Sequence, residues 1–204
     1  MDENTSRLLI GQKKHLASLL EAMQRCVYFL NASDSAVDWP LTGAQLQIQK
    51  KNVDIFESLA AINERFAKLQ DTLGAAMRHS LQLSGEQADS FIKVLSIFEK
   101  SGVVSSIENW QLARAARNLA AHDYETDYNE VAQHFNTLHE LTPELYATAL
   151  RFIQYSDAHR LAALKQLLFV EHFQHGQGRG AGDRATGIGA AQAARGDGVH
   201  DLGL

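Results

Sequence analysis

Residues 53–81 read VDIFESLAAINERFAKLQDTLGAAMRHSL, and their apolar side chains recur every three or four positions. That spacing places the apolar side chains along one side of an α-helix. The stripe consists of Val53, Phe56, Leu59, Ile62, Phe66, Leu69, Leu73 and Met77. We therefore predict one long helix over residues 44–81, whose stripe serves either the core of a bundle or a coiled-coil seam in a dimer.

The segment before this helix also has a helical pattern. A first helix is predicted over about residues 6–30, because apolar residues recur there at helical spacing. The following residues, 31–43, are rich in turn formers and predict a loop. Within that loop, Trp39-Pro40 is expected to lock the chain against the body of the protein.

Capping signals mark the helices that follow. A polar turn at residues 83–87 precedes a helix over about 89–100, which Gly102 ends as a C-terminal cap residue. Ser105-Ser106-Ile107-Glu108 has the capping-box pattern, so another helix is predicted to start there.

The last helical segments are also predicted from their start signals. Asp127 is the expected N-cap of a helix over 128–141, and Thr142-Pro143-Glu144 has the pattern of a new helix that runs to about residue 173. No segment has the sustained alternation typical of strands. The predicted fold class is therefore all-α, an antiparallel helical bundle of about five helices.

The composition changes abruptly after His175, to glycine and alanine with almost no large apolar side chains. Such a segment cannot bury enough surface to offset the entropy lost on ordering. We predict a helical bundle domain over residues 1–174 and a flexible tail over 175–204. The tail's GAGDRA and GIGAAQ lack the full phosphate-loop fingerprint, so no nucleotide site is predicted there.

Composition and charge narrow the class of protein. The net charge of −5 argues against a broad basic surface that coats nucleic acid, but it leaves room for a small cleft with a few arginines. Cys26 is the single cysteine, which favours the reducing cytoplasm. An apolar signal segment and an apolar run of roughly 20 residues are both lacking, so we expect a soluble cytoplasmic protein with no membrane association.

The residues best suited to chemistry lie in RNLAAHDY, residues 117–124. Arg117 offers a planar, bidentate donor for a phosphate, and His122 can move protons near neutral pH. Such a pair can cleave RNA without a metal ion. On an ideal helix the two side chains would point about 140° apart. They therefore meet on one phosphate only if the helix ends near His122 or if two subunits contribute.

This motif resembles the R-x4-H-x-Y signature of HEPN-domain proteins, specifically of their HepT-like toxin branch. Asn118 fits the polar position after the arginine, and the helical layout over roughly residues 6–173 is similar too. The resemblance implies a homodimeric, metal-independent endoribonuclease that needs no cofactor. Arg117 would bind the scissile phosphate, and Asn118 would orient the pair. His122 would act as general base or acid while the ribose 2′-hydroxyl attacks, leaving a 2′,3′-cyclic phosphate.

Tyr124 has a separate implication from the same resemblance. In the HepT-like branch the matching tyrosine receives AMP from a partner, a minimal nucleotidyltransferase that acts as antitoxin. A bulky phosphate beside Arg117 and His122 would block RNA by charge and sterics. The structural alternative is a boundary tyrosine that packs its ring and hydrates its hydroxyl. Tyr128, four residues later, is easily confused with it.

Other readings of the chain stay open. Arg114 lies one turn before Arg117 and either assists RNA binding or belongs to a solvated helix face. His134 and His139 lack a full set of metal ligands, so no metal site is expected. The alternative functions are a non-catalytic helical adaptor that presents substrate to a nucleotidyltransferase, and a purely structural helical dimer.

Overall fold

The computed structural model of the chain describes residues 3–119 and 127–158. Within these two ranges every regular element is an α-helix, which confirms the all-α fold class, with six helices in place of about five. They are α1 (Glu3–Asp34), α2 (Gly43–Ile48), α3 (Val53–Ser84), α4 (Phe91–Lys100), α5 (Ile107–Leu119) and α6 (Tyr128–Ala158). The predicted tail over 175–204 and the domain boundary before it lie outside these ranges.

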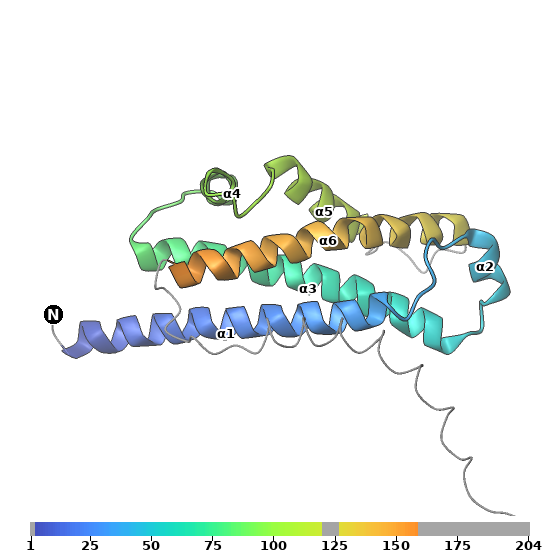
Figure 1. Ribbon diagram of the computed structural model, residues 1–204, viewed down its shortest axis with the longest axis horizontal. Helices are drawn as coiled ribbons and strands as arrows, with labels where there is room; N and C mark the ends of the chain where they lie inside the picture. The colour runs from blue at the N-terminus through green and yellow to red at the C-terminus, as the bar shows by residue number, and fades with distance from the viewer. Residues whose placement is uncertain (1–2, 120–126, 159–204) are drawn as a thin grey trace, which may run out of the picture. The chain divides into compact units, whose positions relative to one another are not determined.

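The core lies where α1, α3 and α6 pack side by side (Figure 1). The predicted stripe of α3 is buried from Leu59 to Met77, and the stripe of α1 is buried from Leu16 to Leu30. The chain direction in Figure 1 shows that α1 is antiparallel to α3, whereas α6 runs in the same direction as α3. The arrangement is thus antiparallel only in part, because α4 and α5 return the chain before α6 begins.

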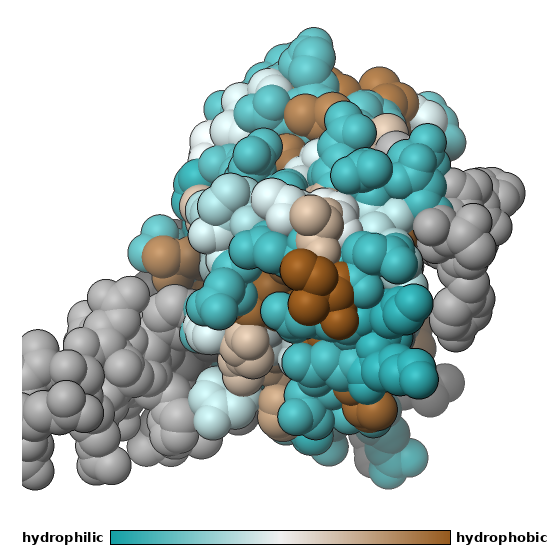
Figure 2. Space-filling view, turned by 90° about the vertical axis from the view of Figure 1, so that its right-hand side faces the viewer, coloured by the Kyte–Doolittle hydropathy of each residue, from teal (hydrophilic) through white to brown (hydrophobic). Residues whose placement is uncertain are grey.

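The prediction of one helix over residues 44–81 is wrong, because the chain breaks between α2 and α3. Thr42 caps α2 in a full capping box with Gln45, and Leu46 is buried while α2 packs on α6. The next apolar residues, Ile48 and Val53, are 84% and 64% exposed. The polar run between them supplies nothing to bury, so no packing holds it in a helix. Figure 2 looks onto this end of the molecule, where apolar side chains lie among hydrophilic ones.

The loop after α1 is held against α6, as predicted from Trp39-Pro40. The indole of Trp39 stacks on the ring of His139 with centroids 4.4 Å apart. Its Nε1 also donates to the backbone oxygen of Asp34 over 2.9 Å. Helix α1 itself is longer than predicted at both ends, so the loop begins only after Asp34.

Gly102 follows the end of α4 as predicted, Gly85 ends α3 within the predicted turn, and the cap of α5 differs from the prediction. Gly85 and Gly102 have left-handed φ angles of 77° and 75°, which glycine adopts without strain. The Ser105–Glu108 capping box is not formed. Ser106 accepts from the backbone nitrogen of Asn109 over 3.0 Å instead. The carboxylate of Glu99, on α4, accepts from the backbone nitrogen of Ile107 over 2.8 Å, so a residue outside α5 satisfies the first N–H of the helix.

The predicted break at Thr142-Pro143-Glu144 is also wrong, since α6 continues through Pro143. Thr142 does not cap a new helix, because its hydroxyl donates to the Leu138 oxygen within the same helix over 2.8 Å. Buried residues continue on both sides of the proline, from Leu138 to Phe152. Their packing offsets the cost of a proline inside a helix, about 3 kcal/mol. The predicted N-cap is confirmed, because Asp127 Oδ1 accepts from the Asn129 backbone nitrogen over 2.8 Å.

Candidate functional site

Arg117 lies in the last turn of α5, and its guanidinium is bound to α3. Nη1 donates to Asp71 Oδ1 over 2.7 Å and to the Ala67 backbone oxygen over 3.0 Å. The Arg117 side chain is 14% exposed, whereas that of Asp71 is 65% exposed. Among the residues that the structure describes, Nε and Nη2 have no partner. The arginine of the motif is therefore fixed through one nitrogen.

The start of α5 is also tied to α3. Gln70 is 2% exposed, and its Nε2 donates to the Trp110 backbone oxygen over 3.0 Å. Gly74 lets the aromatic rings approach, since a Cβ there would lie 3.1 Å from the Phe91 ring. Ala113 and Ala116 are buried along α5 between the two tethers. Small alanine side chains on this face permit close helix contact, so contacts along all of α5 set the position of Arg117 relative to α3.

The other members of the predicted site divide into two groups. Arg114 and Asn118 are exposed, and neither side chain bonds to any residue within 3–119 or 127–158. His122 and Tyr124 lie outside the described residues. Tyr128, the residue most easily confused with Tyr124, is half-buried and packs its ring on Phe56 with centroids 6.4 Å apart.

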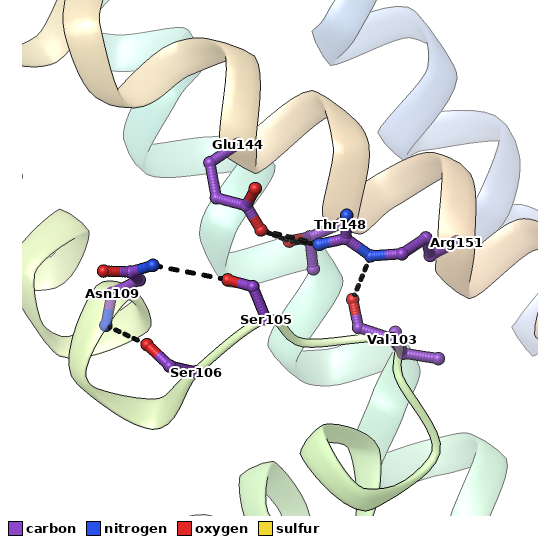
Figure 3. Close-up of polar contacts among 7 residues, drawn as sticks. All are labelled: Val103, Ser105, Ser106, Asn109, Glu144, Thr148 and Arg151. Carbon is purple, nitrogen blue, oxygen red and sulfur yellow. Dashed lines mark hydrogen bonds and ion pairs between the residues drawn. The ribbon is translucent and has the colours of Figure 1, made fainter.

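A polar cluster that the sequence did not point to joins α6 to the turn before α5 (Figure 3). Glu144 Oε1 accepts from Arg151 Nη2 over 2.6 Å and from the Thr148 hydroxyl over 3.2 Å. Arg151 Nε donates to the Val103 backbone oxygen over 2.8 Å. Burial alone would raise the pKa of Glu144, but hydrogen bonds from Ser105 and Arg151, with the charge of Arg151, lower it below its ordinary value. The sequence could have indicated this cluster, because Glu144, Thr148 and Arg151 are spaced so that they lie on one face of a helix.

The histidines of α6 make structural contacts. His139 Nδ1 lies 2.8 Å from Asp34 Oδ1. Burial lowers the pKa of His134, which favours its neutral form. In the part of the chain that the structure describes, no three His, Cys, Asp or Glu side chains come together as metal ligands. No helix there is long and apolar enough to cross a bilayer.

Comparisons of this chain with protein-family models, with curated proteins and with solved structures gave no match. What bears on function is therefore the chemistry of the chain's own residues. The feature that connects motif and structure is the guanidinium of Arg117, which α3 holds at the last turn of α5, five residues before His122.

Proposed function

We propose that this protein is a metal-independent endoribonuclease of the HEPN type, the toxin of a toxin–antitoxin pair. The observation that supports the proposal is the fixed guanidinium of Arg117, held by Asp71 and the Ala67 oxygen through Nη1 alone. A donor that is oriented before the substrate arrives stabilises developing negative charge without reorganising during the reaction. The remaining guanidinium nitrogens are the donors for the phosphate.

In the proposed reaction, Arg117 binds the scissile phosphate and His122 accepts the proton of the ribose 2′-hydroxyl. The 2′-oxygen attacks phosphorus, the bond to the 5′-oxygen breaks, and a histidine returns a proton to that leaving oxygen. The products are a 2′,3′-cyclic phosphate and a 5′-hydroxyl end. Asn118 orients the pair, and Arg114 adds positive charge. A homodimer brings two motifs together, which removes the need for one helix to present Arg117 and His122 on the same side.

The proposed control of this site is the transfer of AMP to Tyr124 by a minimal nucleotidyltransferase antitoxin. The added phosphate is negatively charged and lies seven residues along the chain from Arg117. It would therefore compete with the RNA phosphate for the same guanidinium. Removal of the Tyr124 hydroxyl in Tyr124→Phe is expected to leave cleavage intact and to abolish inactivation by the antitoxin.

The decisive test is RNA cleavage in the presence of a metal chelator, with a control that separates chemistry from folding. Arg117→Ala removes both the phosphate donor and the tether to α3, whereas Asp71→Ala weakens the tether and leaves the guanidinium in place. We expect a loss of about 100-fold or more in Arg117→Ala and in His122→Ala, but less than about tenfold in Asp71→Ala.

Three outcomes would contradict the proposal or favour another function. Cleavage retained by purified His122→Ala contradicts it directly. An equal loss in Asp71→Ala and Arg117→Ala means that the arginine acts only through the fold. A wild-type protein that binds a nucleotidyltransferase tightly but never cleaves RNA is the expected result for the adaptor function.

A further inference from the structure

An arginine outside the motif, Arg78 of α3, lies where α3 meets α4 and α5. Its guanidinium carbon is 5.4 Å from the centre of the Phe91 ring, over the first residue of α4. Arg78 is exposed, and it makes no hydrogen bond or ion pair with the residues that the structure describes. A guanidinium over an aromatic ring keeps its N–H groups available to other acceptors. Arg78 is therefore an oriented cation that no described carboxylate neutralises.

The ring beneath Arg78 is itself fixed between α3 and α5. Phe91 packs on the ring of Trp110, with centroids 5.9 Å apart. A Cβ atom on Gly74 would lie 3.1 Å from the Phe91 ring, so the small glycine lets the ring lie close against α3. The contact between α3 and α5 that positions Arg117 therefore also positions Arg78.

Helix geometry places Arg78 in line with Arg117. Arg117 is bound to Asp71, and Arg78 follows Asp71 by seven residues, so both lie on one face of α3. The rise along α3 from Asp71 to Arg78 is about 10 Å. Arg114 precedes Arg117 by one turn of α5 and is exposed. The three arginines therefore follow the exposed edge of the contact between α3 and α5, and we call them the arginine row.

The charges of the arginine row favour an extended anion. The carboxylate beside it, Asp71, is already paired with Arg117 over 2.7 Å. The exposed residues Ala75 on α3 and Asn118 on α5 add no charge to this edge. Phosphates repeat about every 3.4 Å along a stacked strand, so about 10 Å corresponds to about three nucleotide steps. Arginines at this separation fit the backbone of a single-stranded RNA better than one isolated phosphate.

We propose that Arg78 binds a phosphate of single-stranded RNA about three nucleotides from the phosphate that Arg117 holds, with Arg114 between them. RNA as the ligand comes from the proposed ribonuclease function, on which this assignment rests. Arg78 is a binding residue and takes no part in proton transfer. Because it contacts the backbone alone, it adds affinity for the strand without a preference for any base.

The test is the salt dependence of binding to a 2′-O-methyl RNA octamer, which cannot undergo 2′-hydroxyl attack, measured by fluorescence anisotropy. Loss of one phosphate contact to a single strand lowers the slope of log Kd against log salt by about 0.7. Arg78→Ala should show this change, with roughly fivefold weaker binding at about 0.1 M salt. Arg78→Lys keeps the charge and should retain the wild-type slope. Arg25→Ala removes an exposed arginine of α1, and this control should leave the slope and the affinity unchanged.

The results separate the arginine row from the catalytic site. No RNA binding by the wild type, an unchanged slope in Arg78→Ala, or an equal decrease in Arg25→Ala overturns the proposed contact. A slope lowered as much in Arg78→Lys as in Arg78→Ala also overturns it, because the side chain would then act through its packing on Phe91. Cleavage is measured in parallel on RNA with free 2′-hydroxyls. Arg78-dependent binding without cleavage contradicts the ribonuclease alone, whereas His122-dependent cleavage with an unchanged slope in Arg78→Ala contradicts the phosphate contact alone.

Discussion

Replacement of Asp71 by alanine measures how firmly α3 holds the arginine of the motif. The pair of Arg117 and Asp71 has a 2.7 Å contact, but the carboxylate is 65% exposed. Two unit charges at about 4 Å attract by roughly 1 kcal/mol in water and roughly 4 kcal/mol near a less polar surface. Solvent screening of the exposed carboxylate selects the low end, so Asp71→Ala should lower the free energy of unfolding by about 0.5–1 kcal/mol.

Arg117→Ala should cost more, because it also removes the bond to the Ala67 oxygen and the buried stem of the side chain. We expect about 1.5–3 kcal/mol for this variant. Urea unfolding of both single variants and the double variant gives the coupling energy, which should be about 0.5–1 kcal/mol and should fall in about 1 M salt. Glu57→Ala, an exposed carboxylate on the same helix, is the matched control and should show no coupling with Arg117.

A coupling energy near zero would refute the reasoning, because it would mean that Asp71 does not hold the guanidinium in solution. Arg117 would then not be oriented by α3 in advance of substrate, whatever the cleavage assay shows. A coupling well above about 2 kcal/mol would also contradict it, since an exposed pair cannot supply that much.

Three further predictions concern the frame around the site. Gly43→Ala should lower the free energy of unfolding in urea by about 1–3 kcal/mol, because its Cβ would lie 2.9 Å from a backbone nitrogen of α6. The control is Gly11→Ala, whose Cβ would meet nothing within 4 Å and which should stabilise α1 by up to about 1 kcal/mol. The pKa of Glu144 is lowered in the folded protein. Its ionised carboxylate therefore stabilises the fold above the ordinary carboxyl pKa, and this stabilisation is lost as the pH falls through the lowered pKa of the folded state. The difference in unfolding free energy between wild type and Glu144→Gln should therefore become smaller between pH 6 and pH 3. His139→Ala removes the ring on which Trp39 stacks and should red-shift the tryptophan emission, while leaving the helical circular dichroism unchanged.

The sequence predicted the parts of the fold that depend on local patterns. The stripe from Leu59 to Met77 is buried as its spacing indicated, and Gly102 follows the end of α4 where the pattern placed it. Predictions from local patterns were wrong where tertiary packing determines whether a helix continues or breaks. Nothing in the sequence near Pro143 indicated that buried residues on both sides of it would keep α6 continuous. Equally, helix propensity between Ile48 and Val53 could not replace the missing core contacts.

The contacts that position the candidate site are long-range, which is why the sequence did not predict them. Arg117 and Asp71 are 46 residues apart, and Gln70 and Trp110 are 40 apart. Residues so distant in the chain meet only after the helices have packed, and no short pattern encodes that pairing. The motif therefore identified Arg117 as a residue of interest, but its partners follow only from the contact of α5 with α3.

In the proposed function, Arg117 would both hold α5 on α3 and bind a phosphate, and the geometry of its guanidinium is compatible with both roles. Nη1 donates to Asp71 and to the Ala67 oxygen, and Nε and Nη2 have no partner among the described residues. A lysine carries a single nitrogen, so binding to α3 and binding to a phosphate would compete for one ammonium group. The planar guanidinium separates the two tasks onto different atoms. If the proposed function is correct, the contact that holds α5 on α3 also orients the phosphate donor.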